Sequence, residues 1–204
     1  MSEPFSFSLV SMRATERAHE AVRAVVQAGD HVIDATAGNG RDTCFLADLV
    51  GPDGRVFAFD IQEEAIISTR SRLVAQDLKD ERVILVHASH VTLRRYIERP
   101  IVAVMFNLGY LPGGDHGYRT CREETLVALA EGWNILQEGG VMSVVCYRGH
   151  PGGMEEGEGV LEFAEKLQGQ GATVAISGKD ETEAGPFLVV MKKKGNPTGL
   201  TRPA

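Results

Sequence analysis

Residues 32–49 read VIDATAGNGRDTCFLADL, and this stretch decides the fold. An apolar run ends in an acid, two glycines follow among small residues, and the pattern then becomes helical. Glycines at such a turn let the backbone approach a ligand that a Cβ would exclude. The stretch therefore predicts a strand, a glycine turn and a helix, the place where open α/β sheets bind ligands.

Short apolar runs alternate with helical patterns along the rest of the chain. Seven runs have the length and composition of strands, at 31–35, 55–59, 83–87, 101–106, 141–147, 173–177 and 187–191. Helical patterns lie at 11–28, 42–50, 63–76, 91–97 and 121–136. The alternation predicts an α/β fold with a doubly wound, Rossmann-like and mostly parallel sheet of seven strands. The short polar link GKDETEAGP before the final run suits a hairpin, which makes the last strand antiparallel.

The length of the chain suits one domain. Its 204 residues, 43% of them hydrophobic, are enough for one well-buried core. We expect a single domain over residues 1–194. The terminal stretch GNPTGLTRPA, residues 195–204, has the composition of a flexible tail.

Charge and cysteine content bear on location and partners. The three cysteines, Cys44, Cys121 and Cys146, are scattered and odd in number, which argues against a disulfide framework and fits the cytoplasm. We see no signal-peptide pattern and no apolar run near the roughly 20 residues of a membrane span. The formal net charge of −7 means that any contact with RNA must come from a local basic patch.

Two features of the first half of the chain are typical of a site that binds a nucleoside. The spacing Gly38-x-Gly40-x-x-Thr43 resembles a dinucleotide fingerprint, although many glycine turns simply end strands. Asp60 follows Gly40 by twenty residues at the end of the next predicted strand, where a carboxylate could accept both hydroxyls of a ribose. Asp60 could also cap the following helix, and one residue can do both.

Asp34, directly before the glycine turn, helps to separate NAD from S-adenosylmethionine (SAM). A carboxylate there would repel a pyrophosphate. It could bind the ammonium group of a methionine moiety, directly or through water. The sequence therefore favours SAM, with no metal required.

Three separated motifs, DATAGNGRDT, NLGYLPGGD and YRGHPGG, resemble the bacterial putative rRNA methylase family of class I SAM-dependent methyltransferases. The resemblance extends from about Arg13 to Lys193. Members of this family are associated with methylation of 5-aminomethyl-2-thiouridine at the tRNA wobble position. The resemblance implies SAM as cofactor and the tRNA anticodon loop as partner.

The resemblance also implies which residues form the cofactor site. On the methionine side it places Asp34, Ala35, Thr36, Gly38, Asn39, Gly40, Asp42 and Thr43. It places Asp60 and Gln62 at the ribose, and Ser89 and His90 at the adenine.

The end of the fourth predicted strand is where a class I enzyme places the atom to be methylated. Relatives that methylate amines carry Asn or Asp, then Pro-Pro and an aromatic residue, whereas this chain has Asn107-Leu108-Gly109-Tyr110. The Asn107 amide oxygen can still accept a hydrogen bond from an amine, and Tyr110 could stack on a base or only cover the core.

An alkyl amine must lose a proton before it attacks, because it is largely protonated at neutral pH. The predicted acceptors are Asp115, His116 and His150, each of which could instead be an ordinary loop residue.

The glycine-rich stretch YRGHPGGMEEGE, residues 147–158, predicts a loop that closes over the substrate. Arg119, Arg122 and Arg148 could form a basic rim there, or could be solvated surface charges. Four functions remain open: methylation of tRNA, methylation of rRNA, methylation of a small amine, and a non-catalytic or dinucleotide-binding domain. A homodimer is expected only because many soluble enzymes are twofold dimers.

Overall fold

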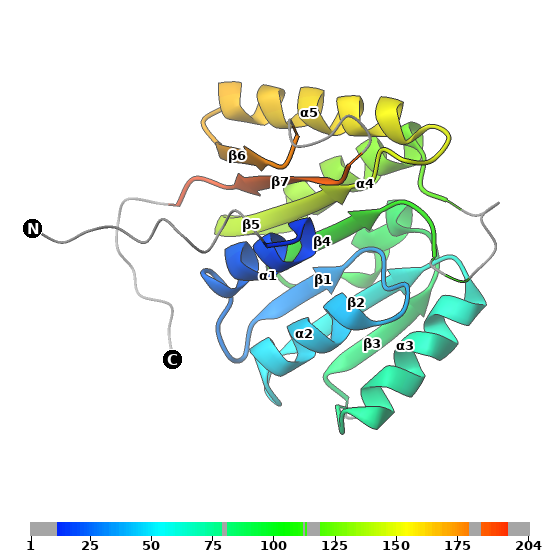
Figure 1. Ribbon diagram of the computed structural model, residues 1–204. Coiled ribbons are helices and arrows are strands. Elements are labelled where there is room, and N and C mark those ends of the chain that lie inside the picture. The colour runs from blue at the N-terminus through cyan, green and yellow to red at the C-terminus, as the bar shows by residue number, and fades with distance from the viewer. Residues whose placement is uncertain (1–11, 79–80, 112, 114–118, 180–184, 196–204) are drawn as a thin grey trace, which may run out of the picture.

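The structure is a computed structural model, which describes residues 12–78, 81–111, 113, 119–179 and 185–195 (Figure 1). In chain order the elements are α1 (Ala14–Arg23), β1 (His31–Asp34), α2 (Arg41–Val50), β2 (Arg55–Asp60), α3 (Glu63–Ala75), β3 (Val83–His87), the 3₁₀-helix η2 (His90–Tyr96), β4 (Ile101–Leu108), α4 (Arg122–Ile135), β5 (Leu136–Cys146), α5 (Gly153–Gly169), β6 (Thr173–Ser177) and β7 (Phe187–Lys192).

One seven-stranded sheet has the order β3-β2-β1-β4-β5-β7-β6. The first five strands of this order are parallel, and β7 is antiparallel to both β5 and β6. The predicted fold class is therefore confirmed, including the reversed last strand. The strand order reverses between β1 and β4, so a crevice is expected at the carboxyl ends of these two strands.

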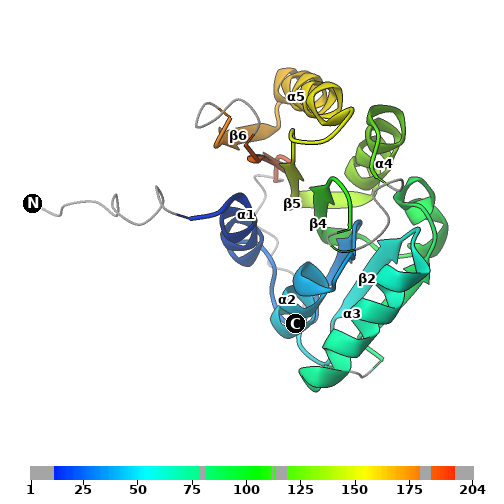
Figure 2. The ribbon, with the colours of Figure 1, turned by 45° about the vertical axis from the view of Figure 1, so that its right-hand side comes forward.

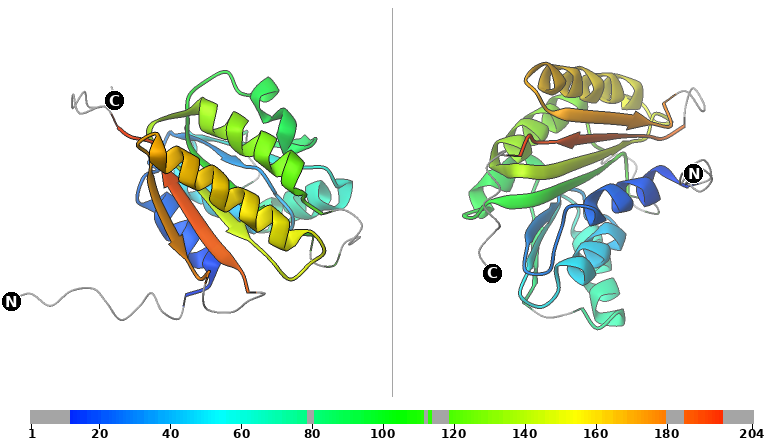
Figure 3. Two further views of the ribbon diagram at one scale, coloured as in Figure 1. Left: turned by 90° about the horizontal axis from the view of Figure 1, so that it is seen from above. Right: turned by 90° about the vertical axis from the view of Figure 1, so that its left-hand side faces the viewer.

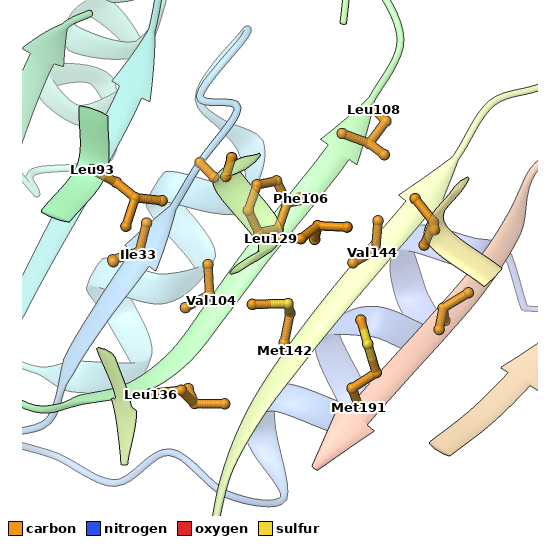
Figure 4. Packing of buried hydrophobic residues seen from close by; sticks show 14 of the residues in the cluster. Ile33, Leu93, Val104, Phe106, Leu108, Leu129, Leu136, Met142, Val144 and Met191 are labelled. Carbon is orange, nitrogen blue, oxygen red and sulfur yellow. The ribbon is translucent and has the colours of Figure 1, made fainter. Parts of the chain in front are cut away.

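Helices pack on both faces of the sheet. Figure 2 and Figure 3 show α1, α2 and α3 on one face and α4 and α5 on the other. On the second face, buried side chains from the central strands pack against α4, as Figure 4 shows for Val104, Phe106, Leu129 and Met142. Each large apolar side chain that is fully buried contributes about 1.5–3 kcal/mol, so this packing holds the central strands in a fixed position beneath the site.

The structure corrects the prediction of a loop over residues 147–158, because α5 begins at Gly153. Two glycines inside α5 allow close packing. A Cβ on Gly157 would lie 3.1 Å from the Phe187 ring, and one on Gly159 would lie 3.1 Å from Arg122 Cγ. Glycine here lets a helix approach its neighbours, whereas the sequence pattern suggests a loop.

Smaller differences concern the ends of elements. β5 begins at Leu136, five residues before the predicted start at Val141, and the register of its pairing with β4 shifts between Ile101 and Ala103. Of residues 91–97, predicted as helical, residues 91–96 form part of the 3₁₀-helix η2, which ends at Tyr96. Except for residue 195, the predicted tail lies outside the described residues. In the part of the chain that is described, no helix is both long and apolar enough to span a bilayer.

Candidate active site

A cavity of about 970 Å³ lies where β1, β2 and β4 end, within the usual size range of pockets for small ligands and cofactors. Its lining brings together residues from all three predicted parts of the site. The predicted residues that line it are Ala35, Thr36, Gly38, Asn39, Asp42, Asp60, Gln62, Ser89, His90, Asn107, Tyr110 and His150. Asp34, Gly40 and Thr43 do not line the cavity. Asp115 and His116 lie outside the described residues.

The Asp60 carboxylate connects the glycine turn to the start of α3. Its Oδ2 accepts a hydrogen bond from the Gly38 backbone N–H at 2.9 Å, and its Oδ1 accepts one from the Gln62 N–H at 3.0 Å. The N-cap position of α3 belongs to Gln62, so Asp60 is not the cap residue. Each carboxylate oxygen has a further lone pair, so both can still accept hydroxyl groups at the cavity wall.

The Asp34 side chain supports the turn from below. It is fully buried, its Oδ2 accepts a hydrogen bond from Thr43 Oγ1 at 2.6 Å, and its Oδ1 accepts one from the Thr36 N–H at 3.2 Å. These contacts correct the interpretation of Asp34 as a direct ligand of an ammonium group. Thr43 is corrected in the same way, because its hydroxyl contacts Asp34 and not the cavity.

Gly40 is a position of close helix packing. Its φ is +75°, and a Cβ there would lie 2.8 Å from the Thr69 Cα in α3. Gly40 thus allows α2 to approach α3 closely, which corrects its predicted contact with a cofactor. Gly38, with φ of +51°, lies at the cavity wall as predicted.

Burial and the negative charge of Asp42 together raise the pKa of Asp34 to about 7, although the hydrogen bonds from Thr43 and Thr36 oppose this shift. A raised pKa in the folded state contributes stability that is fully present below the ordinary pKa, near 4, and lost as pH rises through about 7. As the pH rises from 5 to 8, ionisation of Asp34 should lower the free energy of unfolding by about 2–3 kcal/mol.

Asp34→Asn is therefore expected to remove most of that pH dependence, because an amide does not ionise and can still accept from the Thr36 N–H. Urea unfolding at pH 5 and pH 8 measures the difference. Asp48→Asn, an exposed change on the same helix as Thr43, is the matched control and should behave as the wild type. An Asp34→Asn protein that keeps the full pH dependence would contradict the assignment.

A polar chain of three side chains crosses the cavity wall from α1 to β4. His19 Nε2 lies 2.6 Å from Asp42 Oδ1, and Asn107 Nδ2 donates to Asp42 Oδ2 at 3.3 Å. His19 also stacks on the Phe45 ring at 3.9 Å between centroids. His19 is a site residue that the sequence did not reveal, since nothing in the pattern of α1 distinguishes it from others on the helix surface.

Asn107 is held by two bonds that leave one acceptor available. Its backbone N–H donates to Thr36 Oγ1 at 2.7 Å, in addition to the amide bond with Asp42. The Asn107 Oδ1 atom is buried and has no hydrogen-bond partner in the described part of the protein. Because Asn107 lines the cavity, this oxygen is suited to accept a hydrogen bond from a bound molecule.

His90 offers a second acceptor. Burial lowers the pKa of His90, although the backbone of Ala35 opposes this effect. His90 Nε2 is buried and has no partner among residues whose positions are given. A ring nitrogen without a proton can accept a hydrogen bond, so Nε2 is a candidate acceptor for a bound molecule. An acceptor here suits the exocyclic amine of adenine.

The backbone at Gly109, directly after β4, is fixed through Thr120 by a buried carboxylate on α5. The Gly109 N–H donates to Thr120 Oγ1 at 2.9 Å, and the Thr120 hydroxyl donates to Glu156 Oε2 at 2.8 Å. Thr125 Oγ1 donates to Glu156 Oε1 at 2.5 Å. Burial raises the pKa of Glu156, although the two hydroxyl bonds oppose this effect. These contacts hold the backbone that carries Tyr110.

Tyr110 and His150 lie together at the mouth of the cavity. Their rings meet edge to face, 6.2 Å apart. His150 Nδ1 lies 3.1 Å from the Pro151 carbonyl oxygen, which can only accept, so Nδ1 is the donor in this contact. Its Nε2 is buried and without a hydrogen-bond partner in the described residues. His150 therefore stays a predicted proton acceptor.

Two of the three predicted rim arginines make structural contacts. Arg122 donates to Glu162 Oε2 at 2.6 Å and to the Glu155 carbonyl, and Arg148 donates to the carbonyls of Gly185 and Lys179. Neither lines the cavity, and their contact with an RNA phosphate stays a prediction. Four arginines do line it, and the last of them was predicted: Arg13, Arg17, Arg41 and Arg119.

Comparisons with known proteins agree with this geometry. The family model described as "Putative rRNA methylase" matches residues 56–192. The chloroplastic tRNA (mnm5s2U34)-methyltransferase of Arabidopsis thaliana is 40% identical over 193 residues, which cover 90% of this chain and 70% of the relative.

Two solved structures are also similar over almost their whole length. A putative rRNA methylase of Clostridium thermocellum is 42% identical, with a TM-score of 0.86 over 91% of this chain and 100% of that one. A putative methyltransferase of Streptococcus mutans, solved in complex with SAH, is 36% identical, with a TM-score of 0.80 over 89% of this chain and 98% of that one. The matches to the family model and to these relatives cover most of the chain, and it therefore belongs to the putative rRNA methylase family.

Proposed function

We propose that this chain is a SAM-dependent N-methyltransferase that methylates the aminomethyl group of 5-aminomethyl-2-thiouridine at the wobble position of tRNA. The observation that carries the proposal is the buried Asn107 Oδ1 at the cavity wall, an acceptor positioned to bind an amine. The Arabidopsis relative, whose name specifies this tRNA position, supports the substrate.

SAM would lie along the cavity, with each of its three parts against a different group of lining residues. We assign Asp60 and Gln62 to the ribose, and Ser89 and His90 to the adenine. Thr36, Gly38, Asn39 and Asp42, with Ala35 behind them, would surround the methionine moiety. The relative from Streptococcus mutans, solved with SAH, supports this choice of cofactor. When bound, SAM supplies the methyl group from its sulfonium.

The protein's own part in the reaction is to align the amine and remove its proton. Asn107 Oδ1 accepts an N–H of the amine, which leaves the nitrogen lone pair directed at the methyl carbon. The new N–C bond forms as the C–S bond breaks, and the electron pair of that bond goes to sulfur. The amine proton leaves to a base, for which His150 is a candidate at the cavity mouth and Asp115 and His116 stay predictions.

The rim of the cavity suits an RNA loop. Tyr110 lines the cavity and is 44% exposed, and we propose that its ring stacks on a base of the substrate. Arg13, Arg41 and Arg119 add positive charge to the cavity wall, which an RNA phosphate could contact despite the acidic total. This small basic area suits an anticodon loop better than a large RNA surface such as the ribosome's.

Methylation of purified tRNA tests the proposal. Undermodified tRNA incubated with the enzyme and SAM should gain the mass of one methyl group at the wobble nucleoside, as measured by nucleoside mass spectrometry. Ribosomal RNA and free alkyl amines, incubated in parallel, should gain none. Methylation of rRNA or of the free amines instead of tRNA would favour the corresponding alternative.

Asp60→Ala is expected to weaken SAM binding by about ten- to a hundredfold, since it removes the acceptor for the ribose hydroxyls, an effect of about 1–3 kcal/mol. Isothermal titration calorimetry measures the affinity, and NAD should not compete. A melting curve checks the fold, because Asp60 also accepts from Gly38 and Gln62. Asp53→Ala, an exposed acid just before β2, is the control. Unchanged affinity in Asp60→Ala would remove Asp60 from the site.

The proposal also covers location and assembly. Because tRNA is used in translation, we propose that the enzyme works in the cytoplasm. A homodimer stays a prediction, which light scattering on the purified protein would test.

A further inference from the structure

We propose that Asp42 is a positioning residue, which fixes the direction in which the Asn107 amide faces the substrate amine, and that His19 holds Asp42 in place for this task. The inference rests on the proposed function and adds to it. It starts from the chain His19–Asp42–Asn107, in which each oxygen of the Asp42 carboxylate contacts a different neighbour.

An asparagine amide has nearly the same shape in its two orientations, so its surroundings decide which end points where. A carboxylate oxygen only accepts hydrogen bonds. The end of Asn107 that faces Asp42 Oδ2 at 3.3 Å is therefore the NH₂ group. The opposite end, Oδ1, is the buried acceptor without a partner in the described structure.

The orientation matters for the chemistry of an amine. With Oδ1 toward the substrate, the amide accepts an N–H and the nitrogen lone pair stays available for attack. With NH₂ toward the substrate, the amide would donate to that same lone pair and oppose the reaction. Turning the amide would also set Asn107 Oδ1 against an Asp42 oxygen, which is repulsive. Asp42 thus selects the productive orientation.

His19 fixes the Asp42 carboxylate from the other side. Its Nε2 lies 2.6 Å from Asp42 Oδ1, and its ring is stacked on Phe45 at an interplanar angle of 5°. Asp42 is only 8% exposed, so few water molecules compete for its oxygens. Since His19 lies on α1, Asp42 on α2 and Asn107 on β4, the contact joins three elements at the cavity wall.

An exchange of the two side chains tests the proposal. Asp42→Asn leaves an amide that can present either end to Asn107, so the orientation is no longer fixed. Asn107→Asp sets two carboxylates against each other. The double variant Asp42→Asn/Asn107→Asp restores one donor and one acceptor with the roles reversed, and a carboxylate oxygen again faces the cavity.

We expect each single variant to transfer the methyl group about tenfold more slowly than the wild type, and the double variant to be several times faster than the slower single variant. The rate is measured in single turnover at saturating SAM and tRNA, so that weaker binding does not enter. The affinity for SAM and the melting temperature are measured separately. All three changes keep the side-chain shape, and Asp48→Asn on the same helix is the control.

Three results would overturn the proposal: a double variant no faster than the slower single variant, an Asp42→Asn enzyme with the wild-type rate, or rates that only follow the melting temperatures. If one of these variants does not fold, His19→Phe is measured in its place. This change keeps an aromatic ring against Phe45 and removes the contact with Asp42. It should slow transfer in the wild-type background but not in Asn107→Ala. Wild-type turnover on tRNA in the same assay tests the proposed function independently.

Discussion

An Asn107→Ala enzyme is expected to bind SAM nearly as well as the wild type and to transfer the methyl group about ten- to a hundredfold more slowly. Loss of one well-oriented hydrogen bond costs about 1–3 kcal/mol, which corresponds to this range of rates. The rate of methyl transfer should decrease more than the SAM affinity, because Asn107 Oδ1 acts on the amine during its attack. Single-turnover methylation of undermodified tRNA gives the rate, and calorimetry gives the SAM affinity.

A purely structural role of Asn107 would give a different result. The backbone N–H of this residue, which donates to Thr36 Oγ1, is kept in the alanine variant, so the fold should remain. If Asn107 only stabilised the turn after β4, thermal stability and SAM binding would fall together. Asn134→Ala, an exposed change on α4, controls for loss of an asparagine in general. A stable Asn107→Ala enzyme with normal methyl transfer would exclude Asn107 from the catalytic centre.

Gly40→Ala is expected to lower the free energy of unfolding by about 2–5 kcal/mol. A left-handed conformation costs an ordinary residue about 1–2 kcal/mol, and Gly40 has φ of +75°. The new Cβ would also lie 2.8 Å from the Thr69 Cα, so α3 would have to move, and overpacking of this kind costs about 1–3 kcal/mol. Urea denaturation measures the change.

Gly29→Ala separates these two costs. Gly29 has φ of +88°, but a Cβ there meets nothing within 4 Å in the structure. It should therefore show the conformational cost without the overpacking. Equal losses in the two variants would contradict the argument that Gly40 serves the approach of α2 to α3. Movement of α3 should also weaken SAM binding in Gly40→Ala, since Thr69 Oγ1 donates to the Gly38 carbonyl at the turn.

The fold could be predicted because its main signals are local. Apolar runs of strand length, separated by helical patterns, are visible in any window of the sequence. The prediction was wrong for the start of α5, because its glycines suggest a loop but serve contacts with residues distant in the sequence. Gly157 and Gly159 look like loop residues until Phe187 and Arg122, far away in the sequence, are seen against them.

The site could be predicted only in part, for the same reason. Strand ends and glycine turns mark Asp60 and Asn107, because a residue's place at the end of a strand can be read from its own neighbourhood. The contact of His19 with Asp42 joins residues 23 positions apart, and that of Asn107 with Asp42 joins residues 65 positions apart. Sequence also could not tell that the Asp34 side chain lies under the turn and not above it.

The position of β7 between β5 and β6 has a consequence for synthesis of the protein on the ribosome. Since β6 is made first and its neighbour in the sheet is β7, β6 cannot join the sheet until residues Phe187–Lys192 have emerged. Until then the edge of β5 is open, and unpaired strand edges invite aggregation. Helix α1, made before either strand, packs against both β5 and β7. The cavity wall, which includes His19 of α1 and Gly185 and Pro186 directly before β7, is therefore complete only after β7 has joined the sheet beside α1.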